Sequence, residues 1–263
     1  MISTSLVVLL IAHLFGDFYF QPKWIVRGKE NLKPLPHIIH VAIHFVCAFL
    51  ASWVFVEWWI ALIVSLCVAI SHLGVDYLKS FVEPRCKRTL FKILVFVSDQ
   101  LIHVITLIVA SRFLVHYSFS TNSICNAIYG WFGFTLPAGK LLFYIFALLF
   151  LIQPSNVMNR HILDVIFKDN GIDKKKEASD ANAGVVIGIL ERLTMYCFSA
   201  FLGWHYIIIV VLTAKTFTRL NRFGSKEKKD NGVGDFFAEK YIVGTLLSVL
   251  YVSVCLVLGS FVN

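Results

Sequence analysis

Long apolar runs alternate with short polar segments along almost the whole chain. Each run is close to the roughly 20 residues that an α-helix needs to cross a bilayer. Because a backbone in lipid must satisfy its own hydrogen bonds, such runs predict helices rather than open strands. The pattern predicts an all-α, polytopic membrane helix bundle of about eight transmembrane helices, at residues 2–20, 36–56, 59–78, 93–112, 138–158, 183–203, 205–223 and 241–261.

The composition supports this fold class. Of the 263 residues, 58% are hydrophobic and only 15% are charged, and the mean hydropathy is +0.75, which excludes a soluble globular domain. The first run has no basic residues before it and no small-residue cleavage site, so we expect it to remain in the protein. The six cysteines have no paired spacing, and we interpret them as small apolar residues.

The basic residues indicate how the helices are oriented. The formal net charge is +8, but Lys and Arg cluster between the apolar runs rather than along one face, so we expect no nucleic-acid partner. Alternate connections hold 21 of the 24 basic residues, and loops rich in Lys and Arg stay in the cytoplasm. We therefore expect both termini to lie outside the cytoplasm.

The pattern divides the chain into three parts. Residues 1–112 form a four-span bundle rich in His and Asp, and residues 138–263 form four further spans with basic cytoplasmic loops. Between them, residues 113–137 are expected to form an extracytoplasmic connection with interfacial aromatics, as a re-entrant or a surface helix. Segments 164–182 and 224–235 are expected to be polar loops.

Ionisable residues recur inside the first four runs, where each is costly and usually marks function. Three runs hold a His/Asp pair at a spacing of four, which places both side chains on one helix face. The rise per residue puts these groups in one layer near the cytoplasmic ends of their helices, four of them roughly 9–12 Å and three roughly 3–6 Å deep. The residues are His13 and Asp17, then His37, His40 and His44, then His72 and Asp76, then Asp99 and His103.

This layer predicts a divalent metal site, with zinc first and manganese or iron next. The candidate ligands outnumber those of one tetrahedral ion, so a two-metal cluster is an alternative to a single ion. The predicted ligands are His13, Asp17, His40, His44, His72 and Asp76. There are two alternatives to this prediction. A single intramembrane His is most often a structural residue with its hydrogen bonds satisfied, and the same His and Asp residues could form a proton relay.

The last three runs differ in character. Glu191 and Arg192 are adjacent, and a basic stripe of Lys215, Arg219 and Arg222 lies on the next run. One reading is interhelical ion pairing of Lys215 and Arg219 with Glu191 and Glu239. The other is a substrate-binding anion site, because Arg forks suit phosphate. In that reading Asp99, His103 and Glu191 are the candidate catalytic residues.

Four segments resemble a family of uncharacterised bacterial integral-membrane proteins, domain of unknown function 3307. They are LLIAHLFGDFYFQPKWIVRGK (9–29), HIIHVAIHF (37–45), SHLGVDYLK (71–79) and DQLIH (99–103). The resemblance covers about the first 110 residues and implies a multi-pass protein of the bacterial inner membrane. A weaker likeness, resting only on the His/Asp pairs, is to membrane-bound metal-dependent hydrolases.

These observations favour a metal-dependent hydrolase acting near the cytoplasmic leaflet on an anionic, phosphate-bearing lipid or lipid-linked substrate. One alternative is a proton- or ion-coupled transporter that uses the His/Asp cluster as a relay. Another is a non-enzymatic sensor or recruitment module. The expected partners are membrane lipid and an anionic substrate. The sequence also allows a homo-oligomer.

Overall fold

The computed structural model describes residues 2–86, 88–116, 130, 137–167, 174–226 and 233–262, and the described elements are helices. This confirms the all-α fold class. Ile2 and Val262 form an isolated parallel bridge. The helices are α1 (Thr4–Leu14), the π-helical turn η1 (Phe15–Tyr19), α2 (Lys23–Glu30), α3 (Pro34–Trp53), α4 (Trp58–Val82), η2 (Glu83–Arg85), α5 (Thr89–His116), α7 (Ala138–Ile152), α8 (Pro154–Phe167), α9 (Lys174–Leu202), α10 (Ile207–Lys226) and α11 (Val233–Ser260).

Six helical segments in the described part are long and apolar enough to cross a membrane, so the chain is a multi-pass membrane protein. They are Pro34–Trp53, Trp58–Arg85, Leu90–His116, Ala138–Asp164, Gly184–Leu202 and Glu239–Ser260. The first predicted run, 2–20, is the first member of a helix pair, Thr4–Tyr19 and Lys23–Glu30, that is bent by 84° and adds a seventh span if the pair crosses as one. In the seventh predicted run only Ile207–Phe217 is apolar, which is short for a span. The orientation of the bundle remains a prediction.

Proline and glycine set several helix boundaries. Pro22 lies in the break between η1 and α2, where it cannot continue the α-helical hydrogen bonding. Pro34 and Pro154 open α3 and α8, in the first turn where a missing N–H costs nothing. Gly203, with φ of 68°, follows the end of α9 in the left-handed conformation that glycine adopts without strain.

Several predicted connections differ from the structure or lie outside its described part. The run at 138–158 is two helices, α7 and α8, which meet at Gln153. Helix α9 begins at Lys174, well inside the predicted loop 164–182, and α10 and α11 extend into the predicted loop 224–235. The predicted interfacial aromatics Tyr129, Trp131, Phe132 and Phe134 lie outside the described residues.

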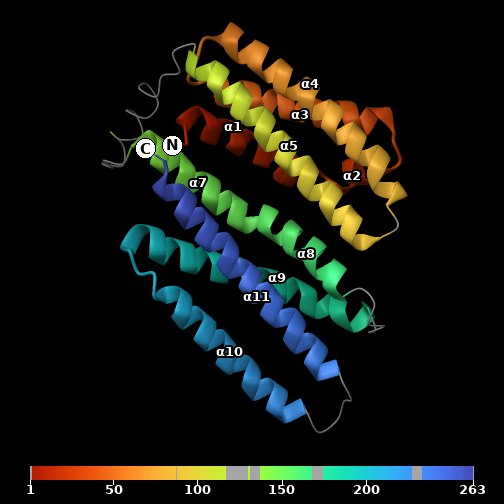
Figure 1. Ribbon diagram of the computed structural model, residues 1–263, viewed down its shortest axis with the longest axis vertical. Helices are drawn as coiled ribbons and strands as arrows, with labels where there is room; N and C mark the ends of the chain where they lie inside the picture. Colours follow the sequence, from red (N-terminus) through yellow and green to blue (C-terminus); the bar gives the residue numbers. More distant parts are fainter. Residues whose placement is uncertain are drawn as a thin grey trace. The chain divides into compact units, whose positions relative to one another are not determined.

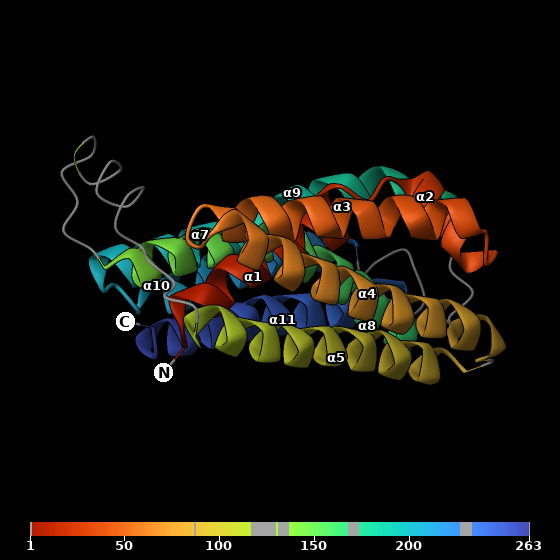
Figure 2. The ribbon, with the colours of Figure 1, turned by 90° about the horizontal axis from the view of Figure 1, so that it is seen from above.

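The chain divides into two compact units, Met1–Leu149 with Phe261–Asn263, and Phe150–Ser260. In the first unit, α4 packs between α3 and α5, and α1 packs against both α3 and α5 (Figures 1 and 2). Its apolar core is a cluster from α1, α4 and α5 that consists of Leu9, Ile60, Val64, Val68, Leu107 and Leu114. Leu9, Val68 and Leu107 each lie one helical turn from a histidine, so this core borders the histidine layer.

The outward faces of these helices are apolar. Leu66, Ile70, Leu101, Ile105 and Val109 are between 51% and 66% exposed, whereas the histidines and aspartates face inward. This distribution is the reverse of a soluble helix bundle and is what a lipid-facing surface requires.

In the second unit a buried arginine holds three helices together. The Arg192 Nε donates to the Leu151 carbonyl oxygen at 2.9 Å, and its Nη2 donates to Asn156 Oδ1 at 2.6 Å. Its Nη1 donates to Ser248 Oγ at 3.4 Å. Because the guanidinium bonds on both sides of the break at Pro154, it supports the junction of α7 and α8.

Candidate metal centre

Asp17 lies in the π-helical turn η1, directly after α1. A π turn holds one extra residue and is often found at functional sites. His13, four residues earlier, keeps its Nε2 3.4 Å from Asp17 Oδ2. The turn therefore presents one imidazole and one carboxylate to the helices packed against α1.

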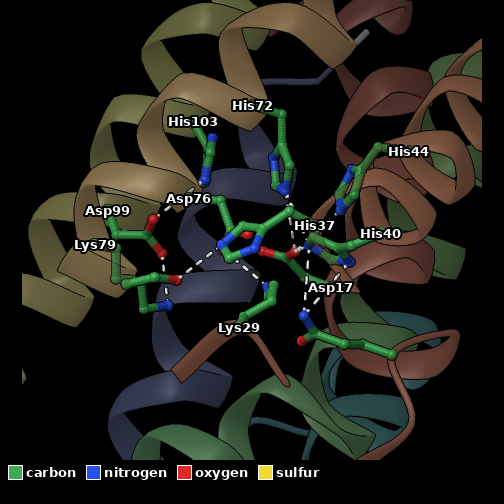
Figure 3. A network of polar contacts seen from close by, with 12 residues as sticks. Asp17, Lys29, His37, His40, His44, His72, Asp76, Lys79, Asp99 and His103 are labelled. Atoms are coloured by element: carbon green, nitrogen blue, oxygen red, sulfur yellow. Dashed lines mark hydrogen bonds and ion pairs between the residues drawn. The ribbon is translucent and has the colours of Figure 1, made fainter. Parts of the chain in front are cut away.

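The Asp17 carboxylate contacts side chains from several helices, and together they form the candidate metal centre (Figure 3). Its Oδ1 lies 3.0 Å from His44 Nε2 and 3.2 Å from His40 Nε2, both on α3. It also lies 3.6 Å from His72 Nε2 on α4. The Gln100 amide of α5 donates to Oδ2 at 3.2 Å. Four elements thus converge on one carboxylate.

The imidazole rings are stacked beside this carboxylate. The His72 ring lies between those of His44 and His103, with centroid distances of 3.6 and 4.1 Å and interplanar angles of 24° and 22°. The Nε2 atoms of His40 and His72 are 3.0 Å apart. His13, His40, His44, His72 and His103 are at most 6% exposed. Three imidazole rings are thus stacked in contact beside one carboxylate.

The other two aspartates each have a lysine partner. Lys29 Nζ lies 2.8 Å from Asp76 Oδ1, and Lys79 Nζ lies 3.0 Å from Asp99 Oδ2. On its other side Asp99 Oδ1 lies 3.3 Å from His103 Nε2. Sequence reasoning used Lys29 and Lys79 only as basic residues of two cytoplasmic connections. The structure adds that both are countercharges of the centre.

A signal for one of these lysines was present in the sequence. Lys29 is four residues after Ile25, and both are buried on the same face of the short amphipathic helix α2. A lysine on the apolar face of a helix requires a carboxylate partner. Gln100, which sequence reasoning also missed, donates to both Asp17 and Asp99.

If the imidazoles are neutral, the charges of the centre do not cancel. Asp76 and Asp99 pair with lysines, whereas Asp17 forms no ion pair with Lys or Arg among the described residues. With neutral imidazoles the centre carries one excess negative charge. A buried uncompensated carboxylate is costly, so the arrangement favours an added cation.

Two overlapping groups of side chains can hold a metal ion. His13, Asp17, His44 and His72 each place one ligand atom within 4.8 Å of the others, and so do His40, His72 and Asp76. Together these groups contain the six side chains predicted as ligands. Two buried atoms of the groups, His13 Nε2 and Asp76 Oδ2, have no hydrogen bond among the described residues. Three imidazoles with one carboxylate match a tetrahedral zinc site.

His37 lies on α3 one turn before His40 but has other partners. Its Nδ1 lies 2.8 Å from the Lys33 carbonyl oxygen, and its Nε2 lies 3.3 Å from Ser80 Oγ. The Nδ1 bond is to the N-cap of α3, and the Nε2 bond joins α3 to α4, so both ring nitrogens are used. His37 is a structural histidine.

Residues 5–131 match the family described as a protein of unknown function, DUF3307. The match covers slightly less than half of the chain, and we refer to the matched residues 5–131 as the DUF3307 domain. The match confirms the resemblance and extends about 20 residues beyond the predicted limit. No curated protein and no solved structure matches the chain.

The centre lies entirely within the DUF3307 domain. Its ligand groups come from residues 13–76, and its second layer of Lys79, Asp99, Gln100 and His103 follows within the same match. The family description names no activity, so the chemistry must be argued from these side chains.

The predicted residues of the second unit lie beyond the DUF3307 domain. Lys215 of α10 forms an ion pair with Glu191 of α9, and its ammonium lies 4.8 Å from the centroid of the Tyr241 ring. This pairing is one of the two readings that the sequence left open. Arg219 and Arg222 are on the same helix, but their side chains lie outside the described part. The substrate-binding role of the stripe and the catalytic role of Glu191 remain predictions.

Gly16 gives the centre its close packing, and we expect Gly16→Ala to damage it. A Cβ at this position would overlap the His44 imidazole. We expect His44 to be displaced from Asp17, the protein to be destabilised by about 1–3 kcal/mol, and metal affinity to fall about 10–100-fold, as for lost ligand support. Thermal unfolding and metal titration of purified protein measure the two effects.

Gly74→Ala is the matched control. Gly74 lies in α4 close to His72, and a Cβ there would meet no atom within 4 Å. Alanine in an open helical position should stabilise by about 0.5–1 kcal/mol. Equal metal affinities for the two variants would show that the contact between Gly16 and His44 does not position a ligand.

Proposed function

We propose that the DUF3307 domain binds a divalent metal ion through Asp17, His13, His44 and His72, with zinc the first candidate and manganese or iron next. The observation that carries this proposal is the Asp17 carboxylate, which faces four imidazoles and has no lysine or arginine ion partner among the described residues. The polar atom left without a hydrogen bond on His13 supports it. His40 and Asp76 extend the donor set toward a second ion.

We further propose that the protein is a membrane-embedded, metal-dependent hydrolase. A bound divalent ion makes water a nucleophile near neutral pH. Asp99 and His103 are the proposed acid–base pair: His103 stacks on His72, and its Nε2 lies 3.3 Å from Asp99 Oδ1. A carboxylate that orients an imidazole is a common means of holding and passing a proton.

The proposed substrate class is a phosphate-bearing lipid or lipid-linked compound. Two features support it. The helices that carry the centre expose apolar side chains, so the surroundings of the centre are lipid. The Lys79 side chain is 22% exposed and pairs with Asp99, so it is a cation beside the proposed acid–base pair that a phosphate oxygen can reach.

We expect Asp99→Asn to separate catalysis from metal binding. Metal-loaded full-length protein would be mixed with detergent micelles containing phosphatidate, and released inorganic phosphate would be measured together with bound metal. Asp99→Asn should lower turnover about 10²–10⁴-fold, as for a lost general acid or base, and should keep the ion. His72→Ala should lose both, and Asp164→Asn, an exposed carboxylate of α8, should lose neither. Unchanged turnover in Asp99→Asn would contradict the assigned role.

One observation favours the transporter alternative. The first apolar segment is broken beside the centre, with an 84° bend between Thr4–Tyr19 and Lys23–Glu30. Broken helices are common at the ion sites of transporters, and stacked imidazoles can relay protons. Proton flux into liposomes by metal-free protein, together with no phosphate release by loaded protein, would favour transport over hydrolysis.

A further inference from the structure

An open hollow lies over α2 and the start of α3, outside the metal centre. Its volume is about 750 Å³, and its lining includes three basic side chains, Lys23, Arg27 and Lys33. Trp24 and Leu35 supply apolar lining, and no carboxylate belongs to it. The hollow is therefore positively charged and partly apolar.

Helix α2 has the character of a helix that lies in the membrane interface. Ile25 and Lys29 are buried, whereas Trp24 is 54% and Leu35 at the start of α3 is 62% exposed. Basic residues beside an exposed tryptophan are typical of helices at the headgroup level of a bilayer. The 84° bend before α2 turns this helix away from the direction of α1. A helix that lies in the plane of the interface after a membrane-inserted helix requires such a turn.

The packing of α2 against α3 makes the hollow a fixed feature of the surface. A Cβ at Gly28 would overlap the Pro36 ring, so the two helices are in close contact at this point. At the next residue of α2, Lys29 reaches the buried Asp76 carboxylate. Lys23 and Arg27 are thus held on an anchored helix, and Lys33 is the N-cap of α3.

We propose that this hollow binds the headgroup of an anionic phospholipid, with the phosphate between Lys23, Arg27 and Lys33 and the acyl chains along Trp24 and Leu35. The charge of the lining selects an anion, and the exposed apolar side chains select a lipid over a soluble phosphate. The proposal does not depend on metal binding or hydrolysis. It places a lipid on the helix that also supplies Lys29 to the metal centre.

Native mass spectrometry of the full chain in detergent tests the proposal, with phosphatidylglycerol and phosphatidylcholine of the same acyl chains as probes. Phosphatidylglycerol should be retained at lower concentration than phosphatidylcholine. Each loss of a cation should weaken its binding about fivefold, so Arg27→Gln should cost about fivefold and the triple variant Lys23→Gln/Arg27→Gln/Lys33→Gln about 100-fold. Phosphatidylcholine binding should change little.

Arg88→Gln is the matched control, because Arg88 is an exposed cation on another connection and does not line the hollow. It should bind phosphatidylglycerol as the unmodified protein does. If the triple variant unfolds, Arg27→Gln alone carries the test. Equal retention of the two lipids, unchanged affinity in Arg27→Gln, or full competition by soluble glycerol phosphate would overturn the proposal.

Discussion

Asp17→Asn is expected to strip the metal ion from the protein while leaving the fold intact. An amide keeps the shape of the side chain but removes the charge that the ion would neutralise. Removing a residue that only hydrogen-bonds to a metal ligand already lowers metal affinity about 10–100-fold. Removing the central ligand itself should therefore lower it more than about 100-fold. Elemental analysis of protein purified in detergent and metal titration would measure this.

Stability measurements separate loss of the ion from misfolding. With a chelator present, the Asp17 carboxylate is a 12% exposed charge that forms no ion pair with Lys or Arg among the described residues. Removing such a charge should leave the unfolding temperature unchanged or raise it. Asp99→Asn is the control, because it makes the same change at a second carboxylate that accepts a hydrogen bond from Gln100, as Asp17 does. The Asp99→Asn protein should keep the ion. Protein that never contains stoichiometric metal, or Asp17→Asn protein that retains it, would refute the metal proposal.

The second large effect is expected from Lys29→Met. This change leaves the Asp76 carboxylate, whose side chain is only 6% exposed, without its countercharge. Breaking a buried ion pair on one side typically costs about 3–5 kcal/mol. Thermal unfolding in detergent, with a chelator present so that no ion replaces the ammonium, would measure the loss.

Two comparisons make this prediction specific. Lys29→Met/Asp76→Asn removes both charges and should recover most of the lost stability. Lys23→Met changes an exposed lysine of the same helix and should stay within about 0.5 kcal/mol of the unmodified protein. If Lys29→Met unfolds at the same temperature as Lys23→Met, the pair with Asp76 does not hold α2 in place.

The spacing of polar residues within each helix was sufficient to predict most of the centre. His13 with Asp17 and Asp99 with His103 are four residues apart, so any helix brings them together, and the structure has both pairs. The shared layer followed from the rise per residue and from the alternation of helix direction. These are local or topological properties, and a single sequence contains them.

Contacts between distant segments could not be predicted in the same way. Lys29 and Asp76 are 47 residues apart. In the sequence, a lysine near a helix end looks the same whether its side chain stays in a cytoplasmic loop or reaches into the bundle. The π turn at Asp17 is also not evident from its residues, and neither is the close packing of Gly16 against His44. Pro22 lies beside the first predicted run, whereas the break at Pro154 was missed although this proline lies inside the predicted run 138–158.

The bridge between Ile2 and Val262 constrains the parity of the membrane crossings. The Ile2 amide donates to the Phe261 carbonyl oxygen at 3.0 Å, so the two ends of the described chain meet on one side of the bilayer. A chain that starts and finishes on the same side has crossed an even number of times. With each of the six candidate segments crossing once, we therefore expect the bent first segment and α10 either both to cross or both not to cross.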